Sequence, residues 1–411
     1  MENYLYKKFK LNLKLAQSNA YFGKVSESCS YYKKHLNDNP YDLVAFNDFL
    51  DIAIKEKNEK VDINFLVAHK EKILKHFGDR QTSFELKEYA ASISSKIMSI
   101  IINHHSDWSL PKDTTDEKPK ERDEIVKLVI LTCVWQRHDL TEVVLSYYNR
   151  LSKSLAAAIQ LDVAVVGSEG DASRRIAERN DCIYMEYPNL PLNEKWEFGL
   201  NELRNHHHDA VIIVGSDDLL PEKLFYTYKR FVEDGVMAAG LTDGYFMDIS
   251  DTVESIYWGG YGGMSRNAGM PWRLNESMGM GRFYSSELLS ILNYSLWKGK
   301  AINRGLDGRA RENVVDLGLL PVTESKLLDV HINGKVVKFG QLGVSLKELG
   351  IFAVDVKVPE SSVTPMTNFY RSHNSVRRIH NVWDLIEENF DTHLLNDLKS
   401  LHSKYKKEGA L

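Results

Sequence analysis

Strand-like and helix-like segments alternate over residues 127–235, and this alternation restricts the fold more than any other feature of the sequence. Short apolar runs such as LVILTCV, DVAVVG, IYMEY and AVIIVG are each followed by a segment with apolar residues at helical spacing. Strands that alternate with helices form a mostly parallel sheet with helices on both faces. We therefore expect an α/β domain over residues 126–325, with ligands bound at the carboxyl ends of its strands.

The segments on either side of this domain have other patterns. Residues 1–106 have helical spacing, and LAQSNAYFGKVSESCSYYKKHLNDNPYD resembles one tetratricopeptide unit; without a clear second copy, a small all-helical domain is favoured. Residues 107–125 are polar, contain two prolines and predict a linker. Residues 326–411 predict a C-terminal extension: a hairpin turning at Asn333 and Gly334, a strand FAVDVKV, and helix from His380.

Composition limits the classes of function. A chain of 411 residues should form two or three domains, and its net charge of −5 gives no global attraction to nucleic acids or anionic membranes. The three cysteines lie far apart and indicate neither a disulfide framework nor a CxxC metal site. The first residues lack the apolar core of a signal peptide, and no apolar run reaches the ~18 residues of a membrane span. We expect a cytoplasmic protein, with a peripheral membrane role left open.

Two neighbouring acids follow an apolar run in VIIVGSDDLLP, residues 211–221. Asp217 and Asp218 at the carboxyl end of a strand repel each other, and such pairs commonly bind a cation. Mg2+ or Mn2+ prefers oxygen ligands and shares phosphate oxygens with a substrate. The motif predicts a metal site for a diphosphate leaving group. The simpler alternative is that one of the two acids caps the following helix.

The motifs, in this order, resemble a GT-A glycosyltransferase of the family 2 type over about residues 127–315. LVILTCVWQR resembles the opening strand and turn, VAVVGSEGD the second strand without its usual paired aspartates, and PNLPLNEKWEFGL a helix entry. GSDD resembles the metal motif, with Gly215 where many members carry a first aspartate, and MGMGRFYS the Gly-Arg-aromatic segment beneath the donor. The resemblance implies a Rossmann-like GT-A fold and donor-binding residues from each motif: Thr132, Val134, Arg137, Glu169, Asp171, Asn189, Asn193, Lys195, Trp196, Ser216 and Arg282.

The stretch of residues 257–285 is rich in glycine, aromatic residues and arginine. Trp258, Tyr261 and Trp272 offer flat faces suited to sugar rings, and Arg266 and Arg273 could meet phosphate or an acidic acceptor. We interpret the stretch as an acceptor-side loop that becomes ordered on donor binding. A solvated linker with a few buried aromatic side chains is the alternative.

Asp307 in RGLDGRA is the candidate catalytic base, because inverting transfer needs a carboxylate that deprotonates the acceptor hydroxyl, and the resemblance implies an acid at about this distance. It could also cap a turn, or orient the donor in a retaining enzyme. Asp355 and Lys357 in FAVDVKV could reach the site from a late strand, but the sequence favours a surface or supporting position for them.

The function favoured by the sequence is a glycosyltransferase that uses Mn2+ or Mg2+ and a nucleotide-sugar donor, with a UDP-sugar preferred. Its acceptor could be a glycan, a lipid-linked sugar, a protein or, in a phage-type version, a modified DNA base. The helical domain could recruit the acceptor or form homo-oligomers. A nucleotidyltransferase is one alternative, although TCVWQRHD lacks the glycine-rich loop expected of it. A non-catalytic helical adaptor with a degenerate sugar-nucleotide domain is another.

Overall fold

The computed structural model describes residues 15–17, 19, 25–39, 42–55, 65, 66, 69, 125–250, 252–261, 276–315, 317, 319, 321, 322, 327–332, 335–359, 366 and 376–408. The chain divides into two compact units. One comprises Met1–Glu117, Val314–Leu320 and Asp329–Val337, and the other comprises Lys118–Asn313, Pro321–Leu328 and Lys338–Leu411. Most of the predicted linker and the predicted hairpin turn at Asn333 and Gly334 lie outside the described residues.

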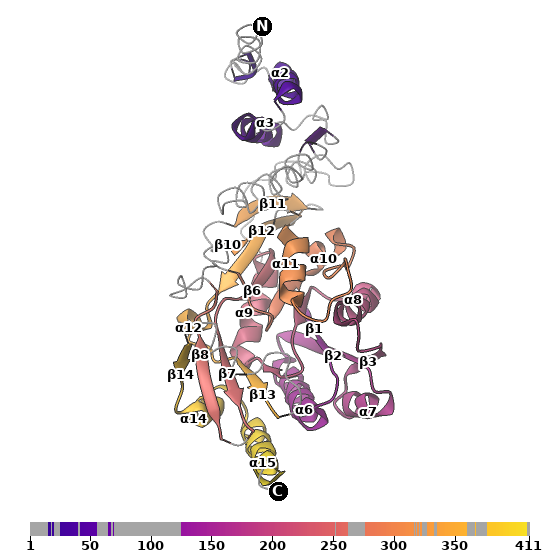
Figure 1. Cartoon of the computed structure of the whole chain (residues 1–411), viewed down its shortest axis with the longest axis vertical. Helices are drawn as coiled ribbons and strands as arrows, with labels where there is room; N and C mark the ends of the chain where they lie inside the picture. The colour runs from indigo at the N-terminus through magenta and orange to yellow at the C-terminus, as the bar shows by residue number, and fades with distance from the viewer. Residues whose placement is uncertain are drawn as a thin grey trace. The chain divides into compact units, whose positions relative to one another are not determined.

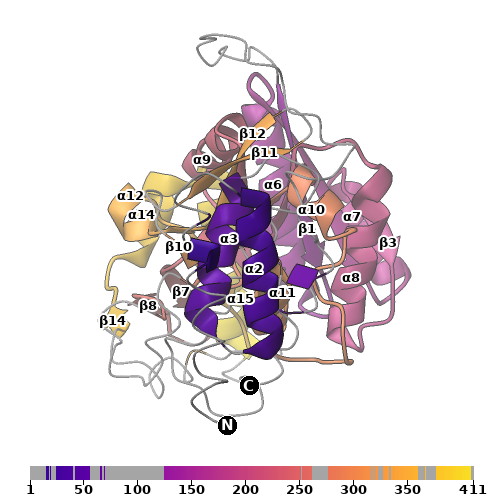
Figure 2. The same ribbon diagram turned by 90° about the horizontal axis from the view of Figure 1, so that it is seen from above.

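In the first unit, two helices pack side by side, α2 (Val25–Asp38) and α3 (Leu43–Lys55) (Figure 2). Tyr32 of α2 stacks on Phe49 of α3 with ring centroids 5.9 Å apart, and both rings are buried. The turn between the helices is closed by His35, whose Nε2 lies 2.8 Å from Asp42 Oδ2. The stacked Tyr32 and Phe49 rings and the His35–Asp42 contact thus both join the two helices, and the apolar packing is the larger source of helix stability.

The main sheet is mostly parallel and belongs to a mixed α/β arrangement (Figure 1). The sheet order is β10-β12-β6-β9-β4-β1-β2-β3, and β11 pairs with β12. Only β9 is antiparallel to its neighbours β4 and β6 among the pairs described for this sheet. The mostly parallel sheet predicted from the alternating pattern is confirmed. Its strands are β1 (Val126–Cys133), β2 (Ile159–Gly167), β3 (Ile183–Glu186), β4 (Ala210–Ile213), β6 (Val236–Leu241), β9 (Arg282–Ser285), β10 (Pro321–Val322), β11 (Leu328–Ile332) and β12 (Lys335–Val344).

Helices cover both faces of this sheet. Successive side chains of β1 point to opposite faces, so the contacts of β1 show which helix lies on which face. Ile130 belongs to the same buried cluster as Tyr148 of α6. On the opposite face, a Cβ at Gly199 of α8 would lie 2.4 Å from Val166 Cγ2 and 3.0 Å from Leu131 Cδ1, so glycine allows that helix its close approach. The helices are α6 (His138–Leu155), α7 (Asp171–Arg179), α8 (Leu192–Glu202), the 3-10 turn η1 (Leu203–Asn205), α9 (Glu222–Glu233), α10 (Ser286–Ile291), α11 (Leu306–Val315) and α12 (Leu346–Leu349).

A second, five-stranded sheet has the order β14-β8-β7-β13-β5. β5 follows directly from the loop after β4, and β13 pairs with it antiparallel and with β7 in parallel. The predicted late strand FAVDVKV is therefore an interior strand of this sheet. The five strands are β5 (Asp218–Leu219), β7 (Gly244–Asp248), β8 (Glu254–Trp258), β13 (Val354–Lys357) and β14 (Val376–Arg378).

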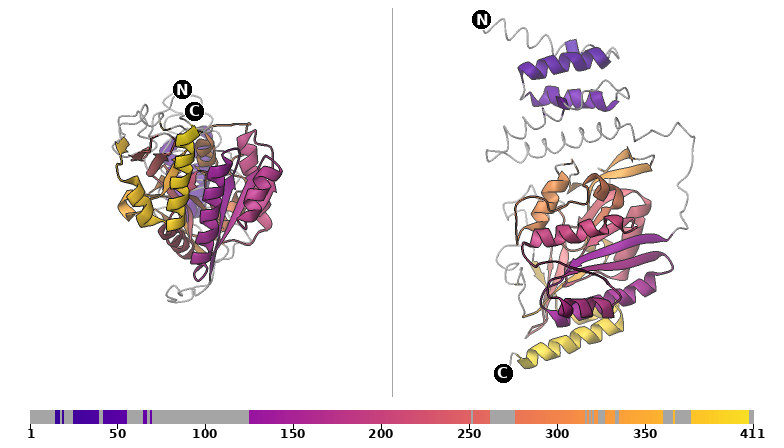
Figure 3. Two further views of the ribbon diagram at one scale, coloured as in Figure 1. Left: turned by 90° about the horizontal axis from the view of Figure 1, so that it is seen from below. Right: turned by 90° about the vertical axis from the view of Figure 1, so that its right-hand side faces the viewer.

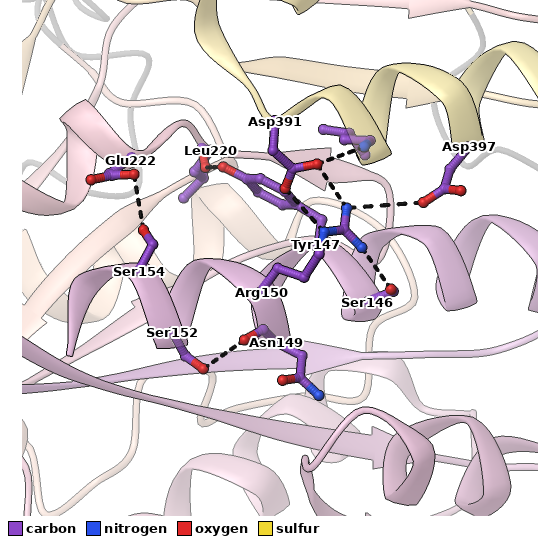
Figure 4. Close-up of polar contacts among 11 residues, drawn as sticks. Ser146, Tyr147, Asn149, Arg150, Ser152, Ser154, Leu220, Glu222, Asp391 and Asp397 are labelled. Carbon is purple, nitrogen blue, oxygen red and sulfur yellow. Dashed lines mark hydrogen bonds and ion pairs between the residues drawn. The ribbon is translucent and has the colours of Figure 1, made fainter.

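Two C-terminal helices, α14 (Val382–Asn389) and α15 (Thr392–Glu408), end the chain, and α15 lies beside α6 (Figure 3). Arg150 of α6 donates from Nε and Nη2 to the two carboxylate oxygens of Asp391 at 3.1 Å each, and from Nη1 to Ser146 Oγ at 2.8 Å (Figure 4). Tyr147 of α6 meets Phe390 edge to face at 5.4 Å. The C-terminal helices are thus packed onto the helix that supports the main sheet.

The Arg150–Asp391 pair gives the first testable prediction. Burial raises the pKa of Asp391, but hydrogen bonds from Arg150 and Leu394 outweigh it and lower the pKa below its usual value. A lowered pKa stabilises the fold above the unfolded pKa of about 4, and this stabilisation is lost as the pH falls. Asp391→Asn keeps the helix cap and removes the charge. It should therefore lower the melting temperature at pH 7 by a few degrees, corresponding to about 1 kcal/mol.

The measurement is a melting curve of both proteins between pH 3 and pH 8, in which the gap should close below about pH 4. Asp397→Asn is the matched control, because that carboxylate lies 3.9 Å from Arg150 and is 44% exposed. A gap of equal size at pH 3 would show that the Asp391 charge is not its cause.

Candidate active site

Three carboxylates come together where the two sheets meet. After β4, the chain passes Gly215 and Ser216 and presents Asp217 and Asp218. The antiparallel register of β5 and β13 places Asp355 opposite Asp218, and Val356 N donates to Asp217 O at 2.8 Å. One carboxylate oxygen of each acid lies within 4.8 Å of the others, the only such metal-capable group among the described residues. The backbone ladder therefore fixes the spacing of the acids.

Two cations contact these carboxylates. Arg137, in the loop after β1, donates from Nη1 to Asp217 Oδ2 at 2.7 Å and from Nη2 to Ser216 Oγ at 2.8 Å. Lys357 of β13 places its Nζ 2.6 Å from Asp355 Oδ2 and 3.4 Å from Asp217 Oδ2. All these groups are largely buried, so the ion pairs are weakly screened by solvent.

The three acids differ in how far the nearby cations offset the effect of burial on their pKa values. Burial raises the pKa of Asp217, but Lys357 and Arg137 outweigh it and lower the pKa to about 2. Burial, together with Asp355 and Asp217, raises the pKa of Asp218 well above its usual range. Burial also raises the pKa of Asp355, to about 7, against the lowering by Lys357. Asp217 is therefore firmly ionised, while the other two acids need more positive charge to ionise at neutral pH.

The residues present fit a divalent cation. Asp355 Oδ1 is buried and has no hydrogen-bond partner among the residues that the structure describes, which leaves a hard oxygen ligand unused. Asp218 Oδ2 accepts one bond from Gly215 N at 2.6 Å, which orients that carboxylate. Asp355 also supplies a third carboxylate where position 215 carries glycine. The ligand set available to Mg2+ or Mn2+ is thus Asp217, Asp218 and Asp355.

Buried tyrosines of α6 hold the backbone of this acidic loop. Tyr148 OH donates to Asp218 O at 2.9 Å and accepts from Leu220 N at 3.1 Å. Tyr147 OH donates to Leu220 O at 2.8 Å (Figure 4). Burial raises the pKa of both phenols, so they remain neutral donors. The backbone groups of Asp218 and Leu220 therefore have hydrogen-bond partners on α6, which fixes the segment that carries the carboxylates.

The loop after β1 is held against the second strand. Gln136 and Arg137 adopt left-handed backbone conformations with φ of 54° and 49°, which non-glycine residues rarely do. Glu169, which follows β2, accepts from Gln136 N at 2.8 Å and lies 3.0 Å from His138 Nε2. Glu169, predicted to contact the nucleoside, thus anchors the loop that carries Arg137. Thr132 is buried on β1, and its hydroxyl has no hydrogen-bond partner in the described part of the chain.

Lys195 of α8 is fully buried, and none of the described carboxylates lies within hydrogen-bonding distance of its ammonium group. Its Nζ donates to Val134 O at 2.7 Å and to Asn189 Oδ1 at 3.2 Å. Burial lowers its pKa. The bonds join the loop after β1 to the loop before α8, so three residues predicted separately to bind the donor lie together in the structure.

Other predicted donor residues contact the protein itself. Asn193 bonds to Ile302 N and Trp297 O, and Trp196 packs on Trp297 with ring centroids 5.5 Å apart. Asp171 lies on the exposed first turn of α7, 3.5 Å from Arg175. The structure thus places these side chains in packing and surface contacts, and their donor-binding roles stay predictions.

Asp307 lies at the first turn of α11, against the segment that crosses the end of β4. A Cβ at Gly279 would lie 2.7 Å from Asp307 Oδ1, and Gly281 N donates to Ile213 O at 3.0 Å. The side chain of Asp307 is 44% exposed. Arg282 is buried beside it and donates to the carbonyls of Ser277, Met278 and Asp307. Arg282 therefore fixes this segment, and Asp307 keeps a carboxylate open to solvent.

The predicted acceptor-side loop is described only at its ends. Trp258 is buried, and it meets Tyr261 edge to face at 4.8 Å. Trp272, Arg266 and Arg273 lie outside the described residues. The acceptor roles of these residues stay predictions.

Asp355 and Lys357 reach the site from a late strand, as the sequence allowed, and both lie in the acid cluster. The surface position that the sequence favoured for them is wrong, since the side chains of Lys357 and Asp355 are 5% and 14% exposed. The signal in the sequence was two opposite charges, two positions apart, in an otherwise apolar strand. Charged side chains on one face of an interior strand need polar partners, and no partner had been assigned to the acids Asp217 and Asp218.

Comparisons with known proteins give no family. Neither a scan of protein-family models nor a search of curated proteins finds a match. A search of solved structures finds 4-diphosphocytidyl-2C-methyl-D-erythritol synthase from Anaerococcus prevotii, at 12% identity over 54% of this chain and 87% of that one, with a TM-score of 0.31. It also finds S. aureus TarS, at 13% identity over 47% of this chain and 55% of that one, with a TM-score of 0.32.

A third similar structure is described as a putative nucleotide-diphospho-sugar transferase from Desulfovibrio desulfuricans. It is 11% identical over 68% of this chain and 99% of that one, with a TM-score of 0.32. At these identities and TM-scores, none of the three similarities carries an activity over to this chain. No helix of the described residues is long and apolar enough to cross a membrane.

Gly215 gives a prediction about the geometry of the cluster. A Cβ at this position would lie 2.8 Å from Asp218 Oδ2 and 2.9 Å from Asp217 Oδ1. Gly215→Ala should therefore force both carboxylates to move, lower the stability of the metal-free protein by about 1–3 kcal/mol and weaken Mn2+ binding. Denaturant unfolding and Mn2+ titration measure the two effects.

Gly308→Ala is the matched control, because a Cβ there meets nothing within 4 Å and the residue lies in α11. It should leave Mn2+ binding unchanged and raise stability by up to about 1 kcal/mol, since alanine favours the helix. Equal stability and equal Mn2+ affinity of Gly215→Ala and the unaltered protein would contradict the crowded geometry.

Proposed function

We propose that this protein is a metal-dependent glycosyltransferase that moves a sugar from a nucleotide-sugar donor to an acceptor hydroxyl. The observation that carries the proposal is the set of three buried carboxylates at the end of β4, with two buried cations beside them. This arrangement suits a diphosphate bound through a divalent ion. A UDP-sugar is the donor we favour, on the resemblance of the sequence motifs.

In the proposed reaction, a bond forms between the acceptor oxygen and the anomeric carbon, and the bond from that carbon to the phosphate oxygen breaks. The leaving diphosphate keeps the electron pair, and Asp307 takes the proton of the acceptor hydroxyl. Arg137 and Lys357 would supply positive charge that stabilises the leaving diphosphate. A divalent ion on Asp217, Asp218 and Asp355 would supply further neutralisation of the leaving group.

The donor and the metal are tested together. We expect one member of a panel of UDP-, GDP-, CMP- and dTDP-sugars to raise the melting temperature in the presence of Mn2+ and not with a chelator. Asp218→Asn and Asp355→Asn should each weaken Mn2+-dependent donor binding by at least about tenfold, since each removes a charged ligand. Asp181→Asn is the control, because that carboxylate is 76% exposed and its contacts are with Lys153 and Asn149 of α6 rather than with the acid cluster.

Donor binding that is unaffected by chelator and by both variants would contradict the metal role. The products decide between the two transferase classes. Glycosyl transfer releases the nucleotide from the sugar, whereas a nucleotidyltransferase would release pyrophosphate from a nucleoside triphosphate. A protein that binds a donor and never turns it over would instead support the non-catalytic alternative.

Asp307→Asn tests the proposed base. It should lower kcat by about 10²–10⁴-fold and leave donor affinity nearly unchanged, because a base acts in the transition state. Glu312→Gln on the same helix is the control, since that exposed side chain lies only near Arg309. An unchanged kcat in Asp307→Asn would remove this residue as the base.

The acceptor class is open, and one described feature favours the version that acts on modified DNA. Arg377 and Arg378 are exposed on the edge strand β14, which pairs with β8. Neighbouring exposed arginines suit phosphate contacts. DNA binding that weakens steeply with salt would support this acceptor, and binding that is absent at low salt would exclude it.

A further inference from the structure

Lys357 occupies the position between two of the carboxylates proposed to bind the metal. Its Nζ lies 2.6 Å from Asp355 Oδ2 and 3.4 Å from Asp217 Oδ2, and the residue is only 4% exposed. Both side chains of β13 reach the cluster because residues two apart share a face of the strand. A divalent ion that uses the oxygens of Asp217 and Asp355 therefore meets an ammonium already bound to them.

The second cation of the cluster is held differently. Arg137 is fixed by two bonds from one planar group, to Asp217 Oδ2 and to Ser216 Oγ. Lys357 is a compact charge on a flexible four-carbon stem. Among the described residues, the side-chain hydrogen bonds of Lys357 go only to Asp355 and Asp217, and its Nζ also lies 6.0 Å from the ring centroid of Phe246. Of the two cations, Lys357 is therefore the one that can leave its carboxylate partners without breaking a further side-chain hydrogen bond. A buried ammonium group needs a negative partner, however, so Lys357 can leave its carboxylates only if another anion takes their place.

The charges indicate which anion that is. An ion bound by Asp217, Asp218 and Asp355 would face these three acids in their ionised form, together with the positive charges of Arg137 and Lys357. Three negative charges against two on the side chains and two on the ion leave one net positive charge in a buried site. A diphosphate that enters with the ion compensates this charge and offers Lys357 a negative partner. The cluster therefore favours the ion and the diphosphate together over the ion alone.

We propose that Lys357 is a built-in counter-ion that blocks the free metal and couples metal uptake to the diphosphate of the donor. Lys357 would turn from Asp355 and Asp217 to the diphosphate when ion and donor enter. It is a positioning residue in this scheme. The inference rests on the proposed function, and it adds an order of binding that the carboxylates alone do not imply.

The experiment measures binding of Mn2+ alone by electron paramagnetic resonance in the full-length protein. Lys357→Gln removes the charge, Lys357→Arg keeps it, and Lys153→Gln removes an exposed charge on α6 that lies 3.7 Å from Asp181. Melting curves establish that each variant is folded. The same titrations are repeated with UDP and with GDP present.

We expect the unaltered protein to bind free Mn2+ weakly and the nucleoside diphosphate to strengthen this binding. Lys357→Gln should bind free Mn2+ at least about tenfold more tightly, because a like charge next to the ion is removed. It should also lose most of the strengthening by the nucleotide. Lys357→Arg and Lys153→Gln should stay close to the unaltered protein in their affinity for the free ion.

The outcomes separate this inference from the proposed function. If the nucleotide promotes Mn2+ binding but Lys357→Gln binds free Mn2+ no better than the unaltered protein, the role of Lys357 is wrong and the function stands. If no protein takes up Mn2+ with or without either nucleotide, both are wrong. Should Lys357→Gln fail to fold, the inference is overturned if the folded Lys357→Arg and unaltered proteins bind free Mn2+ as tightly as with nucleotide.

Discussion

The pairing of Asp217 with two cations is the interaction on which the rest of the site depends. Arg137 reaches it from the loop after β1, and Lys357 reaches it from β13. These residues are 80 and 140 positions from Asp217 in the chain. Because a buried carboxylate without partners costs several kcal/mol, the two cations and the acid must assemble together. The cluster therefore ties the main sheet to the second sheet.

The support behind the acids is polar rather than apolar. Tyr147 and Tyr148 bind the backbone of the segment from Asp218 to Leu220, and both project from α6. The same helix binds the C-terminal helices through Arg150. In the sequence, those helices are an extension beyond the α/β pattern. In the structure, the C-terminal helices and the acidic loop both contact α6, and this helix holds both in place.

Periodicity predicted strands β1 to β4 of the main sheet and the helices that follow them, since alternation of buried strands and amphipathic helices is a local property of the chain. It did not predict β6 and β9, and β12, predicted as part of a hairpin in the C-terminal extension, lies within the main sheet. Periodicity also placed Asp217 and Asp218 at a strand end. It could not predict the pairing of β5 with β13, which depends on contacts between distant segments. Asp355 and Lys357 were underestimated for that reason. For Asn193 and Trp196, helical spacing likewise gave no indication that they contact the segment around Trp297.

The glycine at position 215 and the carboxylate of Asp355 together determine where the third acid of the cluster comes from. A Cβ at position 215 would lie 2.9 Å from Asp217 Oδ1 and 2.8 Å from Asp218 Oδ2, so the present positions of these two carboxylates require a glycine there. The third carboxylate comes from β13, opposite Asp218 in the antiparallel register. That strand brings Lys357 with it, because residues two apart share a face. Recruiting the acid from a strand thus introduces the ammonium that competes for the same oxygens, and the charge of the site is set by the strand register.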